Sequence, residues 1–175
     1  MREVELFTSL IRDIPDFPEP GVVFKDITPV LADGKALKML VDAMAAPFED
    51  AGVTKVAGIE ARGFTLATPV ADRLGAGFIP VRKPGKLPYE TVREDYVLEY
   101  GTDALEIHVD AAHEGERVLL VDDVIATGGT AAAATRLLRR VGAEVIGISV
   151  FIELAFLNGA DMLDGVPLHA LVRYD

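Results

Sequence analysis

The sequence contains no cysteine and no tryptophan among its 175 residues, and it has few basic residues for its length. Without cysteine the chain cannot form disulfides, use a thiolate nucleophile or build a cysteine-based zinc site. Its 17 Lys and Arg residues are outnumbered by 28 Asp and Glu residues, so the net charge is −11. Because binding to the backbone of nucleic acids depends on Lys and Arg, this balance argues against a general nucleic-acid partner.

Long apolar runs are also absent from the sequence. Charged residues interrupt each apolar run before it reaches the roughly 18 residues that a membrane-spanning helix requires. The first residues, MREVELFTSLIRDIPDF, lack the apolar core of a secretory signal. Half of the residues are hydrophobic, and a chain of this length can bury about 70% of its unfolded surface. We therefore expect a single domain over residues 1–175, cytoplasmic and without a membrane partner.

Short β-rich runs alternate along the chain with longer helical patterns. The β-rich runs occupy residues 55–59, 78–81, 118–121, 145–151 and 168–172. The helical patterns occupy residues 35–51, 64–74 and 130–141. Such alternation predicts βαβ units, and hence an α/β fold with a mostly parallel twisted sheet and flanking helices.

Two segments depart from this alternation. Residues 14–33 carry several prolines, which predicts an ordered excursion over the sheet. Residues 96–109 alternate around Gly101, Thr102 and Asp103, which predicts a β-hairpin with its turn at these three residues. The stretch between Arg82 and Arg93 has little core-forming character, so we expect a mobile loop, a common place for functional residues.

The most informative stretch is RVLLVDDVIATGGT, at residues 117–130. A strand that is apolar on both faces ends there in two carboxylates, Asp122 and Asp123. Ligands of open α/β sheets bind beyond the carboxyl ends of the strands, where a helix start offers free N–H groups to a phosphate. The turn that opens the next helix contains Thr127, Gly128, Gly129 and Thr130. Its glycines permit close approach to a ligand and its hydroxyls can donate hydrogen bonds, so it predicts a phosphate site.

Two carboxylates beside a phosphate site repel an anionic ligand unless something offsets their charge. A sugar diol can donate hydrogen bonds to Asp122 and Asp123, and Mg²⁺ can neutralise them, directly or through water. Together with the turn, the pair therefore indicates a ribose phosphate with Mg²⁺. The turn has neither the Lys of the P-loop nor the glycine spacing of dinucleotide-binding motifs, and taken alone it is equally typical of an ordinary helix start.

This stretch resembles the phosphoribosyl-diphosphate (PRPP) motif of type I phosphoribosyltransferases. The resemblance to the adenine phosphoribosyltransferases covers nearly the whole chain. It is carried by further segments in the same order, at residues 16–29 (DFPEPGVVFKDITP), 60–64 (EARGF), 81–88 (VRKPGKLP) and 98–108 (LEYGTDALEIH). It implies the type I phosphoribosyltransferase fold, with a small hood at about residues 1–33 and a mobile loop at about residues 82–100. It also implies that adenine and PRPP are converted to AMP and pyrophosphate in purine salvage.

The resemblance also implies a role for each of several residues. Arg62, Lys83 and Lys86 would contact the pyrophosphate of PRPP, with Tyr100 near it. Asp122 and Asp123 would hold the ribose hydroxyls. The 5′-phosphate would be bound by Ala126, Thr127, Gly128, Gly129 and Thr130.

The resemblance places adenine under the hood. Phe24 would lie near the face of the base, Val23 would offer backbone hydrogen bonds to its edge, and Arg62 would also be close. Glu99 would manage the proton of the imidazole ring as general acid or base. Mg²⁺ as cofactor and a homodimer are implied in the same way.

Three alternatives stay open at this stage. A phosphoribosyltransferase for a 6-oxopurine or a pyrimidine would share the motif at residues 122–130. A PRPP-sensing transcription regulator can use the same fold, but it needs a DNA-binding module, and this chain is acidic. A nucleotide-binding module without catalysis would keep the phosphate turn and dispense with Glu99.

Overall fold

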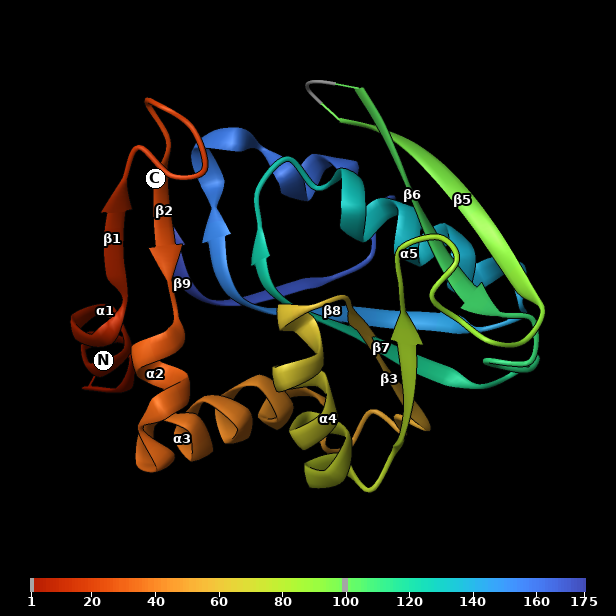
Figure 1. The fold of residues 1–175 in the computed structure, drawn as a ribbon. Helices are drawn as coiled ribbons and strands as arrows, with labels where there is room; N and C mark the ends of the chain where they lie inside the picture. Colours follow the sequence, from red (N-terminus) through yellow and green to blue (C-terminus); the bar gives the residue numbers. More distant parts are fainter. Residues whose placement is uncertain (1, 99–100) are drawn as a thin grey trace.

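The computed structural model describes residues 2–98 and 101–175 (Figure 1). The α-helices are α1 (Arg2–Leu10), α2 (Thr28–Ala32), α3 (Gly34–Ala45), α4 (Arg62–Leu74) and α5 (Gly129–Arg140). The 3-10 helices are η1 (Ala46–Phe48), η2 (Ala155–Leu157) and η3 (Gly159–Met162). The strands are β1 (Arg12–Pro15), β2 (Val23–Asp26), β3 (Lys55–Ile59), β4 (Gly77–Val81), β5 (Thr91–Leu98), β6 (Gly101–His108), β7 (Arg117–Ile125), β8 (Glu144–Leu154) and β9 (Leu168–Tyr174).

A parallel sheet forms the centre of the molecule, with its strands in the order β4-β3-β7-β8-β9. Each predicted β-rich run lies in one of these strands, which confirms the mostly parallel α/β sheet. The central strand β7 buries Val118 and Leu120 in one hydrophobic cluster, and Leu119 and Val121 in another. Side chains that alternate between two cores explain why residues 118–121 are apolar at every position.

Helices cover both faces of the sheet. Figure 1 shows α5 on one face and α3 and α4 on the other. Leu137 and Leu138 of α5 pack into the cluster that contains Leu120, while Leu40 of α3 and Leu66 of α4 pack into the opposite cluster. No helix within residues 2–98 or 101–175 combines the length and the apolar character needed to cross a membrane.

The predicted helix over residues 35–51 is too long. The α-helix α3 ends at Ala45, and η1 takes over at Ala46. Proline has no N–H group and its ring displaces the preceding turn, so Pro47 stops the α-helical ladder. The helix predicted over residues 130–141 corresponds to α5, which ends at Arg140. Shortly after it, Gly142 has a φ of 96°, in the left-handed region that favours glycine after a helix.

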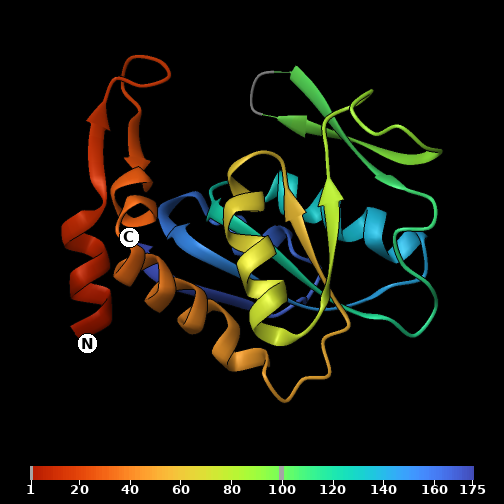
Figure 2. The same ribbon diagram turned by 60° about the horizontal axis from the view of Figure 1, so that its bottom comes forward.

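The hood is formed by α1, the antiparallel pair β1–β2, and α2. It stands beside β9 at one end of the molecule (Figures 1 and 2). Phe7 of α1 packs edge-on against Phe151, with ring centroids 5.4 Å apart. Lys25 lies 4.2 Å from the centre of the Tyr174 ring and pairs with Asp13 at 2.7 Å. The hood is thus anchored to the sheet by apolar packing and to β9 by a cation–π contact.

The predicted hairpin exists, but its turn was placed wrongly. Gly101, Thr102 and Asp103 belong to β6, where Gly101 pairs with Leu98 and Asp103 with Tyr96, so these three residues do not form the turn. The mobile loop predicted over residues 82–100 is also wrong in part, because residues 91–98 form β5. Its inward-facing positions include the charged Glu94, which pairs with Arg136 of α5 and makes the strand look like a loop in sequence.

Candidate active site

The candidate site lies at the carboxyl ends of three adjacent strands, β4, β3 and β7. A cavity of about 330 Å³ opens there. Ligand sites of open α/β sheets occupy this edge, so the location agrees with the prediction. The predicted residues that line the cavity are Arg62, Lys83, Asp122, Asp123, Ala126, Thr127, Gly128 and Thr130. The structure therefore brings together residues from four separate segments of the chain: the turn after β3, the start of the loop after β4, the end of β7 and the turn into α5.

The carboxylate pair does not terminate its strand, contrary to the prediction, because β7 continues to Ile125. Asp123 is only 5% exposed and forms an ion pair with Arg62. Asp122 lies against the start of α4, where a Cβ atom on Gly63 would be 2.8 Å from its Oδ1 atom. Burial and the negative charge of Asp123 raise the pKa of Asp122 well above its usual range.

Arg62 joins the carboxylate pair to the hood. Its guanidinium carbon is 5.0 Å from the centre of the Phe24 ring, while its Nε atom donates to Asp123. Phe17 packs edge-on against Phe24 with the ring centroids 5.3 Å apart. The two predicted adenine-binding side chains, Arg62 and Phe24, therefore touch, and Val23 lies beside them with 49% of its surface exposed. The peptide bond between Glu60 and Ala61, directly before Arg62, is cis.

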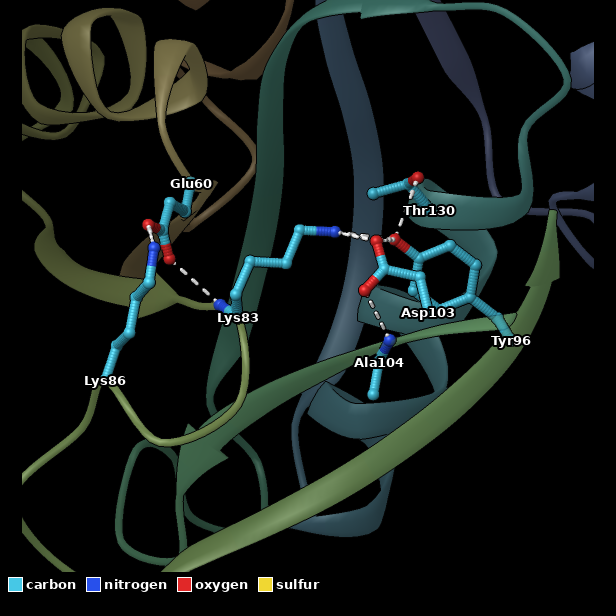
Figure 3. Close-up of polar contacts among 7 residues, drawn as sticks. All are labelled: Glu60, Lys83, Lys86, Tyr96, Asp103, Ala104 and Thr130. Atoms are coloured by element: carbon cyan, nitrogen blue, oxygen red, sulfur yellow. Dashed lines mark hydrogen bonds and ion pairs between the residues drawn. The ribbon is translucent and has the colours of Figure 1, made fainter. Parts of the chain in front are cut away.

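The basic residues Arg82, Lys83 and Lys86 share one acidic partner, Glu60, to which no role was assigned from the sequence. Glu60 forms an ion pair with Lys86 and accepts a hydrogen bond from the backbone N–H of Lys83 at 2.9 Å (Figure 3). Its carboxylate also lies 3.4 Å from the Nε atom of Arg82. Burial alone would raise the pKa of Glu60, but the bonds from Lys86 and Lys83 outweigh it and lower the pKa to about 2. Glu60 is the first residue of the EARGF segment. The basic residues after β4 need a counter-ion, and this requirement was the signal that could have pointed to Glu60.

The turn into α5 has the features that an anion site requires. Gly128 adopts a left-handed φ of 82°, and no side chain caps the start of the helix. The helix therefore keeps backbone donors and the positive end of its dipole available to a ligand. Gly159 of η3 packs against Ala126 and Gly128 so closely that neither glycine has room for a Cβ atom. Sequence analysis missed Gly159, because nothing near it in the chain points to the turn.

Some predicted site residues lie outside the cavity or outside the described part of the chain. Lys86, Val23, Phe24 and Gly129 are not among the residues that line the cavity. Glu99, the predicted acid or base, and Tyr100 both fall outside the described residues.

The donor set for a metal consists of two carboxylates. Across residues 2–98 and 101–175, no group of three or more His, Asp or Glu residues is placed to hold an ion. Mg²⁺ commonly takes one or two carboxylates from the protein and completes its shell with water and substrate phosphates. Asp122 and Asp123 therefore fit a Mg²⁺ ion that arrives with a phosphorylated ligand.

Comparison with known proteins agrees with this geometry. The family model of the phosphoribosyl transferase domain matches residues 30–160. An adenine phosphoribosyltransferase from Anaeromyxobacter dehalogenans is 57% identical over 164 residues, which cover 94% of this chain and 95% of the relative. The chain belongs to the adenine phosphoribosyltransferase family. Another member, from Parafrankia, is 62% identical over 93% of this chain and 89% of its own.

Solved structures of adenine phosphoribosyltransferases share the fold. That from Rhodothermus marinus superposes with a TM-score of 0.95 at 52% identity, covering 99% of both chains. That from Saccharomyces cerevisiae, solved with adenine and an imino-altritol bisphosphate, superposes with a TM-score of 0.93 at 36% identity and covers 97% of this chain and 98% of its own. The predicted type I phosphoribosyltransferase fold is confirmed.

Proposed function

We propose that this protein transfers the 5-phosphoribosyl group of PRPP to adenine, producing AMP and pyrophosphate for purine salvage. One observation carries the proposal: Arg62, Lys83, the Asp122–Asp123 pair and residues 126–128 and 130 line one cavity, in a chain of the adenine phosphoribosyltransferase family. Each of these groups suits a different part of PRPP, and residues 1–175 act as one catalytic unit.

Departure of pyrophosphate is the step that the cationic side chains support. A nitrogen of adenine bonds to ribose C1 while the bond from C1 to the pyrophosphate oxygen breaks, and the electron pair leaves with that oxygen. Arg62, Lys83 and Lys86 stabilise the negative charge that develops there, with Tyr100 contributing a hydroxyl or packing contact. Fixed charges aimed at developing charge are usually the largest contribution to catalysis.

The opposite end of PRPP is held away from the reacting carbon. The N–H groups and hydroxyls at residues 126–130 bind the 5′-phosphate, and Asp122 and Asp123 accept hydrogen bonds from the ribose hydroxyls. Binding energy at this end positions C1 for attack. Asp122 and Asp123 would hold a Mg²⁺ ion that arrives with PRPP, directly or through water, and the bound ion would neutralise part of the pyrophosphate charge.

Adenine lies under the hood in this proposal. The contact between Arg62 and Phe24 supports a base site beside these two residues, with Phe24 near the face of the base and the backbone of Val23 at its edge. An adenine edge carries an acceptor and a donor that complement a backbone N–H and C=O, whereas a 6-oxopurine carries the reverse pattern. Glu99 takes up or returns the proton of the imidazole ring.

Formation of AMP from labelled adenine tests the proposed reaction. We expect label in AMP only when PRPP is present, and a marked loss of activity when Mg²⁺ is removed with a chelator. Xanthine, guanine and orotate in the same pyrophosphate-release assay serve as competing bases. Far better use of any of them would overturn the assignment to adenine, and turnover that is unchanged in Glu99→Ala would remove the role of Glu99.

We also propose that the protein acts in the cytoplasm as a homodimer, without a nucleic-acid or membrane partner. The resemblance to the family supports the dimer, and the cysteine-free composition suits a reducing compartment. Light scattering coupled to size-exclusion chromatography tests the dimer. A mass equal to that of one chain over the micromolar range would contradict it.

A further inference from the structure

The ammonium group of Lys83 is held by the β5–β6 hairpin. Its Nζ atom forms an ion pair with Asp103 of β6 and donates to the hydroxyl of Tyr96 of β5 at 3.1 Å (Figure 3). An ammonium group carries three N–H donors. Asp103 and Tyr96 take two of them, and Lys83 also lines the cavity, so the third N–H group is available to a ligand there.

The two hairpin residues are themselves fixed. Tyr96 and Asp103 are directly opposite each other in the register of β5 and β6. The Tyr96 hydroxyl donates to Asp103 Oδ2 at 3.2 Å, and Asp103 Oδ1 accepts from the backbone N–H of Ala104 at 2.8 Å. Tyr96 is 5% exposed, so its ring has little freedom to move.

The same hydroxyl reaches the phosphate turn. Thr130 Oγ1 donates to the Tyr96 hydroxyl at 3.5 Å, and a Cβ atom on Gly129 would lie 3.7 Å from the Tyr96 ring. The phenol oxygen thus accepts from Lys83 and Thr130 and donates to Asp103, which uses its full hydrogen-bonding capacity. Asp103 therefore bonds to two members, Lys83 and Tyr96, of a continuous polar chain that runs from Lys83 to Thr130 in the turn into α5.

We propose that Asp103 is a positioning residue for PRPP, which acts by holding Lys83 so that its remaining N–H group points at a pyrophosphate oxygen. This inference rests on the proposed function, because it uses the contact between Lys83 and pyrophosphate. Asp103 stays bound to Lys83 when PRPP enters, since the ligand needs only the third donor. Neither the composition nor the family motif gave Asp103 a role, and the sequence pattern placed it in a turn.

The charge state of Lys83 is consistent with this arrangement. Burial alone would lower the pKa of Lys83, but Asp103 and Tyr96 outweigh it and raise the pKa above its usual value. Lys83 consequently remains a cation although it is partly buried, and it keeps three donors.

A double-mutant cycle in the full-length protein tests the proposal. In Asp103→Ala we expect the KM for PRPP to rise about tenfold, the effect of losing one well-placed charge-assisted hydrogen bond, while the KM for adenine stays unchanged. In a Lys83→Met background, Asp103→Ala should add no further increase, because the residue acts through Lys83. Asp103→Asn, which keeps an acceptor of the same size, should give a smaller increase and covers the case in which the alanine variant does not fold.

Asp95→Ala is the matched control. Asp95 lies on β5 opposite Ala104, pairs with Arg93, and has a side chain that is 66% exposed. The substitution Asp95→Ala removes one carboxylate from the same hairpin and leaves the contacts of Lys83 intact, so we expect the KM for PRPP and the KM for adenine to be unchanged.

The outcomes separate this inference from the proposed function. If Lys83→Met raises the KM for PRPP and Asp103→Ala does not, the positioning role is wrong while the role of Lys83 stands. If Asp103→Ala raises this KM equally in both backgrounds, or raises the KM for adenine as well, Asp103 acts on the hairpin in general and the inference also fails. If Lys83→Met leaves the KM for PRPP unchanged, the proposed contact between Lys83 and pyrophosphate is itself wrong.

Discussion

Gly159 lies in η3, far along the chain from the turn at residues 126–130, yet its backbone packs directly against that turn. A Cβ atom on Gly159 would overlap the carbonyl oxygen of Ala126 and lie 2.9 Å from the backbone nitrogen of Gly128. Its φ is not in the left-handed region, so glycine is required there for space and not for conformation. The close packing of the turn at residues 126–130 against η3 thus requires a residue without a side chain at position 159.

We expect Gly159→Ala to push the turn away from η3 and to weaken the binding of AMP about tenfold, since the turn would no longer present its donors at the right distances. Isothermal titration calorimetry measures this change. Gly34→Ala is the control, because Gly34 has open space around it at the start of α3, and alanine there should leave AMP affinity unchanged. Equal affinity in both variants would show that the turn tolerates the displacement.

The pKa of Glu60 gives a prediction about pH. This pKa falls from 4.5 to about 2 in the folded protein, so the folded state binds its proton more weakly than the unfolded state. The stabilisation is complete above pH 4.5 and is lost as the pH falls toward 2. We expect the difference in unfolding free energy between the wild type and Glu60→Gln to be constant above that window and to shrink within it. Urea denaturation at a series of pH values measures it, and a difference independent of pH from 5 to 2.5 would contradict the assignment.

At the scale of elements, the hairpin is fastened to the helix that carries the phosphate turn. Glu94 of β5 pairs with Arg136 of α5 at 2.5 Å and with Arg140 at 3.3 Å, and Arg140 also donates to the carbonyl oxygen of Arg93 at 2.7 Å. Tyr96, Leu105 and Ile107 extend the same attachment into the core. The polar network around Lys83 therefore rests on a hairpin that α5 supports along its length.

We expect Glu94→Gln to loosen the hairpin without unfolding the sheet. The arginine side chains of these ion pairs are 39% and 51% exposed, and pairs with such exposed partners contribute up to about 1 kcal/mol each. The free energy of unfolding should therefore change little, while hydrogen exchange of the β5 and β6 amides becomes faster. Exchange measured by mass spectrometry should leave β7 and β8 unaffected. Asp95→Asn, on the outer face of the same strand, is the control. Exchange as slow in Glu94→Gln as in this control would show that apolar packing alone holds the hairpin.

At the scale of the molecule, the proposed AMP site involves the hood, α4, β7 and α5 together. A ligand that contacts all of these elements stabilises the folded state as a whole, by about 2.7 kcal/mol at a hundredfold excess over its Kd. For a domain of this size that corresponds to an increase in Tm of roughly 5–11 °C. We expect AMP to produce such a shift and GMP at the same concentration to produce a much smaller one. Thermal unfolding followed by calorimetry measures both, and an equal shift with GMP would contradict the proposed base site.

Local patterns were sufficient to predict the central sheet, the helix α5 and the turn that opens this helix. A strand that is apolar on both faces can be recognised from a few consecutive residues. Glycines and threonines at the start of a helix are an equally local signal, so both features are visible in a short stretch of sequence. The same reasoning went wrong for residues 91–103. There β5 carries a charged inward-facing residue, Glu94, whose partners lie on α5. Asp103, which the pattern placed in a turn, belongs to β6.

The partners of the site residues came only from the three-dimensional structure. Lys83 meets Asp103 from 20 residues away, Lys86 meets Glu60 from 26 residues away, and Arg62 meets Asp123 from 61 residues away. Gly159 supports the phosphate turn across a similar gap. A sequence shows which side chains can carry charge or permit close approach, because that chemistry belongs to the residue. The contacts between these side chains depend on how β3, β4, β7 and the β5–β6 hairpin lie next to one another. Packing of the whole core decides that arrangement.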